Sequence, residues 1–346
     1  MARKLTVVVS QGQSANPAKR KLEEDIVAGL LFERGVEVTV VPHLYDLTPD
    51  GTGMLCLQGI TGDMVVLSWL YSRGTFWTLD RNGIRGREGR VMLINEAEEE
   101  DEDEEAAADE KQRVLASRDR PNRTIWCLDL KARNDAKPFL DEVVRIRDEQ
   151  TVQTVSLGGL LGGLSIVTPP TPAAPRIESQ PVAAPIVPLQ PTIIADDGAR
   201  RWYPVIDYSR CTNCMECIDF CLFGVYGVDK VDTILVEQPD NCRKGCPACS
   251  RVCPENAIIF PQHKTPAIAG SPDGSAGAFK IDLSKLFGAP DALEQAVLER
   301  DVELVAVGRD AVGMEIGLPK RQTAAETVGP KDDLDKLMDS LDDLDL

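Results

Sequence analysis

Short, largely apolar runs alternate with amphipathic stretches over the first 150 residues of the chain. Leu5–Ser10 and Val36–Val41 have the β-branched composition that is typical of buried strands. Between them, Asn16 and Pro17 indicate a helix start, because Asn is a favoured N-cap and Pro fits the first helical position. Apolar residues then recur at helical spacing up to Gly35, where a helix ends readily. They are Leu22, Ile26, Val27, Leu30 and Leu31.

Three further stretches have the composition of strands, namely Met64–Leu70, Arg90–Ile94 and Thr124–Leu130. A last helix is predicted from near Asp135, with Phe139, Val143, Val144 and Ile146 as its apolar residues. Strands that alternate with helices predict a mostly parallel, helix-covered sheet. The sequence therefore predicts an α/β domain over residues 1–150, although residues 45–63 and 71–89 show no assignable pattern.

Two segments interrupt this pattern. Nine of the ten residues from Glu96 to Glu105 are acidic, and a run of like charges repels itself. We therefore expect a disordered acidic insertion over residues 96–122. The stretch from Pro169 to Pro191 is rich in Pro and Ala, which is typical of an extended, semi-rigid linker. We place this linker at residues 151–200, between two domains.

Eight of the ten cysteines fall in two runs beyond the linker. The runs are Cys211-x2-Cys214-x2-Cys217-x3-Cys221 and Cys242-x3-Cys246-x2-Cys249-x3-Cys253, the second followed by Pro254. A [4Fe–4S] cluster needs four thiolates, three from one tight loop and the fourth from a distance. Two runs therefore predict two clusters and, as the broad function, one-electron transfer.

The fourth cysteine of such a run ligates the other cluster. By this crossed rule, cluster 1 is predicted to use Cys211, Cys214, Cys217 and Cys253. Cluster 2 is predicted to use Cys242, Cys246, Cys249 and Cys221.

These motifs give residues 201–263 a resemblance to a bacterial-type two-[4Fe–4S] ferredoxin domain. The resemblance implies a ferredoxin-like βαββαβ core in which each half supplies one cysteine run. Tyr203–Ile206 would open the first half, and Ala257–Phe260 would close the second. The expected fold class is then α+β multidomain, with the mostly parallel α/β domain followed by this dicluster domain.

The runs depart from the family pattern in three ways. Leu222 stands where a proline usually follows the fourth cysteine of the first run. The second run has three residues, not two, between Cys242 and Cys246, and the spacer from Gly224 to Asn241 is longer than a minimal ferredoxin requires. The extra residue near Gly245 alters the loop geometry without removing a ligand.

A C-terminal extension follows over residues 264–330. Phe279–Leu283 and Val302–Val307 resemble strands, and Asp291–Leu298 resembles a helix. Residues 331–346 form an acidic amphipathic tail whose leucines recur at helical spacing among aspartates. We expect this tail to be a helix, which either packs on its own protein or docks in a partner's groove.

The formal net charge of −18 argues against a nucleic-acid partner, because phosphate binding needs clustered Lys and Arg. No stretch reaches the roughly 18 apolar residues of a membrane-spanning helix. The short apolar run after the basic N-terminus is too short for a signal peptide. Clustered cysteines without an export signal suit a reducing compartment. We therefore expect a cytoplasmic protein that acts on redox partner proteins.

Three functions remain open from the sequence. The first is an iron–sulfur electron carrier or redox subunit rather than a self-contained enzyme. The second is an electron-input subunit or single-chain oxidoreductase whose N-terminal domain binds a flavin or nucleotide. Its candidate loop is Ser10–Asn16, before a helix N-terminus, although this loop matches neither glycine-rich nucleotide motif. The third is an adaptor with two all-thiolate zinc sites. No catalytic residue pair is identified.

Overall fold

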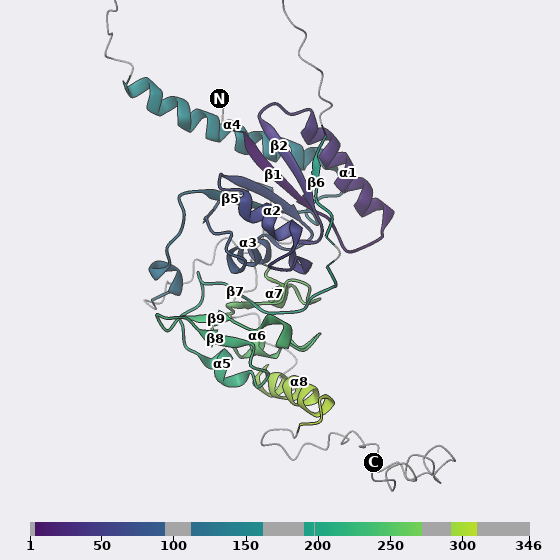
Figure 1. Cartoon of the computed structure of the whole chain (residues 1–346), viewed down its shortest axis with the longest axis vertical. Helices are drawn as coiled ribbons and strands as arrows, with labels where there is room; N and C mark the ends of the chain where they lie inside the picture. The colour runs from purple at the N-terminus through teal and green to yellow at the C-terminus, as the bar shows by residue number, and fades with distance from the viewer. Residues whose placement is uncertain (1–3, 94–111, 162–189, 197, 272–291, 310–346) are drawn as a thin grey trace, which may run out of the picture.

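The computed structural model describes residues 4–93, 112–161, 190–196, 198–271 and 292–309 (Figure 1). This part of the chain forms two units that lie against each other. The sheet unit comprises the described residues up to 200. The cysteine unit comprises residues 201–271 and 292–309 and carries both cysteine runs.

The sheet unit is built on six strands in the order β4-β5-β3-β1-β2-β6, and their pairings are parallel. The central strand β1 pairs Val7 with Val38 on one side and with Val65 on the other. The strands are β1 (Leu5–Ser10), β2 (Val36–Val41), β3 (Met64–Ser68), β4 (Arg87–Glu88), β5 (Thr124–Asp129) and β6 (Thr192–Ile193). The mostly parallel, helix-covered sheet expected from the sequence is therefore confirmed.

One face of this sheet is covered by α1 (Pro17–Leu31) and α4 (Ala136–Leu161). The start of α1 is the predicted one, because Asn16 Oδ1 accepts the Ala18 N–H at 2.9 Å and Pro17 is the first helical residue. Alternate strand residues such as Val7 and Val9 pack against these helices. The helices contribute Leu22, Ile26, Leu30, Phe139, Val143 and Ile146.

The opposite face is covered by α2 (Thr52–Gly59) and α3 (Ser72–Arg81), with the 3-10 helix η1 (Leu44–Asp46) beside them. Both α-helices lie in the two stretches that carry no assignable sequence pattern. In Figure 1 they lie between the sheet and the cysteine unit, whereas α1 and α4 lie on the far side. Every residue from Arg73 to Asp80 of α3 is therefore buried, although Arg73, Thr75, Thr78 and Asp80 are polar.

The cysteine unit has the element order βαββαβ. Strand β7 pairs antiparallel with β10, and β8 pairs antiparallel with β9. The elements are β7 (Val205–Ile206), α5 (Glu216–Phe220), β8 (Tyr226–Val228), β9 (Ile234–Val236), η4 (Pro239–Asn241), α6 (Ala248–Val252) and β10 (Ile258–Ile259). Helices α7 (Pro266–Ala269) and α8 (Ala292–Ala306) follow.

The two units share one hydrophobic core. A single cluster of buried residues runs from Val66 of the sheet through Trp77 of α3 to Ile258 of the cysteine unit. The rings of Tyr45 and Tyr203 stack with centroids 4.2 Å apart. Each tyrosine also bonds to the other's backbone, since Tyr203 N–H donates to Tyr45 Oη at 2.7 Å and Tyr203 Oη donates to the Tyr45 carbonyl at 2.9 Å.

A buried ion pair crosses the same interface. Arg73 of α3 donates from Nε to Asp207 Oδ2 at 2.5 Å and from Nη2 to the Asn256 carbonyl at 2.6 Å. The side chains of Arg73 and Asp207 are only 9% and 1% exposed. These contacts argue against a cysteine unit that swings freely on a tether.

Several predicted elements differ from the structure. Arg90–Ile94 is not a strand over its described residues; the short β4 precedes it and pairs with β5, after which Met92 N–H bonds to Glu142 of α4 at 2.7 Å. Val302–Val307 is not a strand either, because its residues up to Ala306 continue α8.

The two predicted interruptions also contain ordered parts. Residues 112–122 of the expected insertion include the 3-10 helix η3 (Val114–Ser117). The expected linker contains the end of α4 and the edge strand β6, which pairs with β2. The remaining acidic insertion, the Pro/Ala-rich stretch, Phe279–Leu283 and the acidic tail lie outside the described residues.

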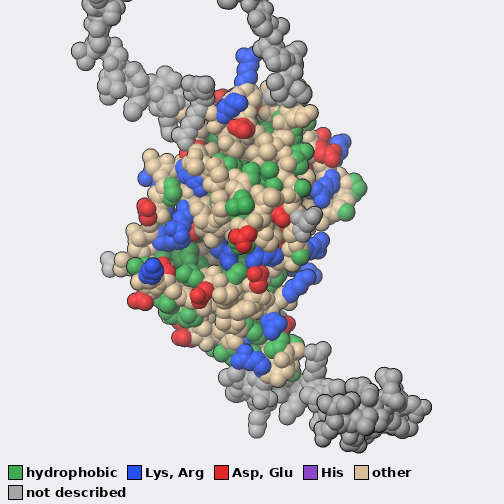
Figure 2. Space-filling view, viewed as in Figure 1, with side chains coloured by type: hydrophobic (Ala, Val, Ile, Leu, Met, Phe, Trp, Pro, Cys, Tyr) green, Lys and Arg blue, Asp and Glu red, His purple; other side chains and the backbone are tan. Residues whose placement is uncertain are grey.

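The acidic excess of the chain lies mainly outside the described residues, in the run from Glu96 to Glu105 and in the aspartate-rich tail. Lys and Arg side chains gather around the middle of the visible face, where the two units meet (Figure 2). In the described part of the chain, we find no helix with the length and hydropathy needed to cross a bilayer.

We predict that Arg73→Met lowers the free energy of unfolding by about 3–5 kcal/mol, because it removes the nearer of the two cations at the buried Asp207 carboxylate and leaves only the longer contact with Arg210 at 3.7 Å. Urea unfolding under anaerobic conditions measures this. The exposed Arg34 provides the control, since Arg34→Met should change stability by less than about 0.5 kcal/mol. Adding Asp207→Asn to Arg73→Met should recover part of the loss. If Arg73→Met and Arg34→Met were equally stable, the stabilising role of the ion pair between Arg73 and Asp207 would be contradicted.

Candidate metal centres

The eight clustered cysteines line two separate cavities of the cysteine unit. The first cavity is lined by Cys211, Cys214, Cys217 and Cys253. The second is lined by Cys221, Cys242, Cys246 and Cys249. Each cavity thus receives three cysteines of one run and the last cysteine of the other, which is the grouping that the crossed rule expects.

Two five-residue helices produce this exchange. Helix α5 carries Cys217 and ends before Cys221. Helix α6 carries Cys249 and ends before Cys253. The last cysteine of each run therefore lies one helical turn beyond the third cysteine and lines the other cavity.

The first cysteine loop is held in shape by left-handed residues and side-chain hydrogen bonds. Asn213 and Met215 have φ angles of 61° and 65°, and Asn is one of the few residues that adopts this conformation readily. The Asn213 side chain accepts the Ile234 N–H at 2.9 Å and donates to the Asp232 carbonyl at 2.7 Å. These bonds fix the loop on β9.

The extra residue of the second run is accommodated in a tight turn. Cys246 N–H donates to the Arg243 carbonyl at 3.0 Å, and Gly245 has a φ of 90°. A turn of this kind needs a positive φ at its third position, which glycine supplies without steric strain. The inserted residue therefore lengthens the loop while Cys246 still lines the second cavity.

Two thiols accept hydrogen bonds from groups that the sequence did not single out. Tyr226 Oη donates to Cys249 Sγ at 3.1 Å in the second cavity. Ala257 N–H donates to Cys253 Sγ at 3.2 Å in the first. Tyr226 is buried at 6% exposure, so its hydroxyl is held in a site from which water is largely excluded. The sequence holds no signal for this contact, because it depends on β8 lying beside α6.

Burial raises the pKa of most of these thiols. The pKa of Cys211 and of Cys246 rises to about 11, and that of Cys217 to about 12. Burial likewise raises the pKa of Cys249, although the Tyr226 hydroxyl opposes the rise. These four thiols are protonated at neutral pH when free, so a metal that binds them must displace their protons.

The two cavities differ in how exposed their cysteines are and in which elements lie beside them. Cys214 of the first cavity is exposed. The second lies beside α8, whose Arg300 lines the cavity and stacks its guanidinium 4.7 Å from the Phe220 ring centroid. Arg251 of α6 pairs with Glu299 of α8 at 3.0 Å. Cys214 is thus an exposed thiol of the first cavity, whereas the four cysteines of the second are half-buried or buried.

Residues just after the acidic run brace the first cavity. Val114 N–H donates to the Cys211 carbonyl at 2.9 Å, and Leu115 N–H donates to the Tyr208 carbonyl at 3.0 Å. Arg113 Nη1 pairs with Glu255 at 2.7 Å. The sheet unit thus supplies part of the wall behind a cysteine loop that lies almost one hundred residues later in the sequence.

The candidate nucleotide loop is occupied by the protein itself. Glu23 of α1 is buried, and its Oε1 accepts the Gly12 N–H and the Trp69 Nε1–H, both at 2.7 Å. A carboxylate therefore already takes the loop N–H group that a bound phosphate would need. This arrangement does not favour a nucleotide at Ser10–Asn16.

The two remaining cysteines lie away from both cavities. Cys127 is buried in β5, as expected for a core thiol, and Cys56 is partly buried in α2. Among the described residues, no three His, Cys, Asp or Glu side chains are arranged to hold one single metal ion.

Comparison with known proteins gives one partial similarity. A stretch of 66 residues, 19% of this chain, is 52% identical to a protein of Methanocaldococcus jannaschii described as an uncharacterized ferredoxin. The match spans 44% of that relative, so the chain covers less than half of its length. The similarity supports a ferredoxin-type domain. No family model and no solved structure matches the chain.

We predict that Gly245→Ala lowers the free energy of unfolding by about 1–2 kcal/mol, the approximate strain of a left-handed alanine. The space around Gly245 is open, so backbone strain alone is tested. Gly59→Ala is the matched control, because Gly59 also has open space but lies at the end of a helix. It should be neutral or slightly stabilising. If urea unfolding gave both variants the same free energy of unfolding, a side chain at position 245 would not strain the turn.

Proposed function

We propose that the chain is an iron–sulfur electron-transfer protein that holds one [4Fe–4S] cluster in each cysteine-lined cavity. The first cluster is ligated by Cys211, Cys214, Cys217 and Cys253, and the second by Cys221, Cys242, Cys246 and Cys249. The observation that carries the proposal is the division of eight thiols into two sets of four, each around its own cavity. The similarity to a ferredoxin supports it.

The donor set and its surroundings suit this cofactor. All four donors of each cavity are thiols, which is the ligand set of a [4Fe–4S] cluster. A zinc ion instead needs four donors around a single centre at about 2.0–2.3 Å, and the thiols are spread around each cavity rather than gathered at one point. Bound there, a cluster supplies reversible one-electron chemistry.

The chain's own residues tune and shield these sites. Tyr226 and the Ala257 amide place hydrogen-bond donors on sulfur, which favours the more negative, reduced state. Phe220, Phe223 and Val225 line the second cavity with apolar side chains and exclude water. The exposed Cys214 marks the first cavity as the side where a redox partner protein approaches.

Anaerobic purification tests the cofactor, and we expect about eight iron and about eight acid-labile sulfide per chain. About two zinc per chain without sulfide would overturn the proposal. A yellow cofactor released on denaturation would instead favour an oxidoreductase with a bound flavin.

Two double variants test the crossed ligation. Cys217→Ala with Cys253→Ala removes two thiols of the first cavity only, so about half of the iron should remain. Cys217→Ala with Cys221→Ala removes one thiol from each cavity, so most of the iron should be lost. Iron and sulfide analysis measures both, and Cys127→Ala is the control that should retain full iron. The reverse order of the two double variants would indicate that each run fills one cluster by itself.

We predict that Tyr226→Phe lowers the reduction potential of the second cluster by about 20–60 mV, the equivalent of one lost hydrogen bond. The first cluster should keep its potential. Redox titration followed by EPR measures both couples.

Tyr208→Phe is the control, because Tyr208 Oη donates to the Ile234 carbonyl at 3.0 Å rather than to sulfur. It should destabilise the fold without moving either potential beyond experimental error. A common shift in both variants would mean that Tyr226 acts through packing alone.

A further inference from the structure

A polar cavity of about 250 Å³ lies at the carboxyl edge of the sheet, away from both cysteine cavities. The loop Gln11–Gln13 after β1 and the turn Pro42–Leu47 after β2 form two of its walls. The segment around Arg200, which leads from β6 into the cysteine unit, forms the third. The ends of parallel strands are where sheets of this class bind ligands. The volume is at the small end for such sites.

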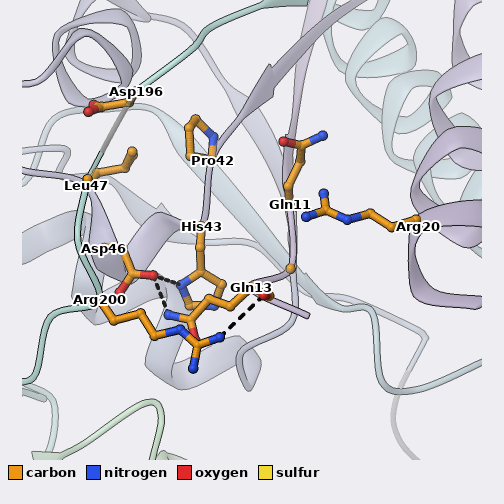
Figure 3. A pocket seen from close by; sticks show the side chains of 11 residues that line it. Gln11, Gln13, Arg20, Pro42, His43, Asp46, Leu47, Asp196 and Arg200 are labelled. Atoms are coloured by element: carbon orange, nitrogen blue, oxygen red, sulfur yellow. Dashed lines mark hydrogen bonds and ion pairs between the residues drawn. The ribbon is translucent and has the colours of Figure 1, made fainter. Parts of the chain in front are cut away.

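The acidic side chains of the pocket are already used by the protein. Asp46 accepts hydrogen bonds from Gln13 Nε2, and at 3.1 Å from both Arg201 N–H and Gln262 Nε2. Asp196 accepts the Gly53 N–H at 3.3 Å near the start of α2, and in Figure 3 it points away from the arginines. Their oxygens are therefore held by uncharged donors of the protein itself, and the two carboxylates keep their negative charge.

The cationic side chains are much less satisfied. Arg20 of α1 is 41% exposed and reaches only Glu23 Oε2, at 3.4 Å. Arg200 makes one long contact, from Nη2 to the Gln13 carbonyl at 3.5 Å. Within the described ranges, it takes part in no ion pair. In Figure 3 the two guanidinium groups approach the pocket from different elements. The pocket thus offers spare N–H donors of positive charge.

His43 adds a buried ring nitrogen that has no hydrogen-bond partner among the described residues. The residue is 9% exposed and lines the pocket, and its Nδ1 has no hydrogen bond among the described residues. Asp46 Oδ2 lies 3.5 Å away, which is too far for a good hydrogen bond. Burial lowers the pKa of His43, which the Asp46 carboxylate opposes and Arg200 reinforces. A neutral imidazole provides one donor and one acceptor to a ligand.

We propose that this pocket binds a small organic anion, whose carboxylate or phosphate group lies between Arg20 and Arg200 and whose polar body contacts His43 and Gln11. Arginine suits both anionic groups, because its planar fork matches their oxygens. No Phe, Tyr or Trp side chain lines the pocket among the described residues, which does not favour a flavin ring there. The small volume also favours a compact molecule.

The pocket is linked to the cysteine unit through the backbone that closes it. Arg201 N–H binds Asp46, and its guanidinium pairs with Asp240 at 2.8 Å, two residues before Cys242. Binding at the pocket does not require the clusters, so this inference stands apart from the proposed function.

Isothermal titration calorimetry on the purified holoprotein tests the proposal with three probes: inorganic phosphate, succinate and adenosine monophosphate. We expect at least one to bind with a dissociation constant below about 10 mM. Binding of phosphate alone would identify a free inorganic ion. Binding of succinate or of the nucleotide would identify the organic class.

Arg20→Gln and Arg200→Gln should each weaken binding by about 10- to 100-fold, as expected for a lost charged hydrogen bond. Lys21→Gln is the matched control, since it removes the same charge from an exposed neighbour on α1. It should change affinity by less than about twofold. Unchanged iron content and melting temperature would show that each variant is folded, and Arg200→Lys should restore part of the affinity. Absence of binding by all three probes, or equal binding by all variants, would overturn the proposal.

Discussion

The ion pair between Arg73 and Asp207 is the contact on which the arrangement of the two units depends. Asp207 sits at the point where β7 ends and the first cysteine loop begins, and its carbonyl accepts the Cys211 N–H at 2.9 Å. Its almost fully buried carboxylate is compensated across the interface by Arg73 of α3, while Arg210 and Ser209 of its own unit contact it as well. The sheet unit therefore fixes the position of a cysteine that lines the first cavity.

This dependence explains which parts of the fold could be predicted from sequence. Local rules predict strands β1, β2, β3 and β5 because they are short apolar runs. They predict helix α1 because its apolar residues recur at helical spacing after an N-cap. Helix α3 does not follow these rules, because its polar residues, such as Arg73 and Thr78, are buried as well as its apolar ones. The edge strand β6 could not be predicted from the sequence either, because a strand of two residues is too short to show a pattern.

The candidate site divides in the same way. The cysteine spacing led to the same two groups of four thiols as the two cavities, because the expected pattern of ligation is local in the sequence. Tyr226, Arg300 and the brace at Val114 come from other elements, and only the folded chain brings them to the cavities. The Glu23 carboxylate is comparable, since it occupies a loop that resembles a ligand site in the sequence alone.

The exchange of the last cysteine between the two runs also limits the stage of synthesis at which a cavity is complete. The thiol that completes the first cavity belongs to Cys253, the last cysteine of the second run. The other three thiols of that cavity are synthesised about forty residues earlier, before the fourth thiol is available. Neither cavity has its full set of thiols before the second run has been synthesised, so a group that needs all four thiols of one cavity can bind only after that point.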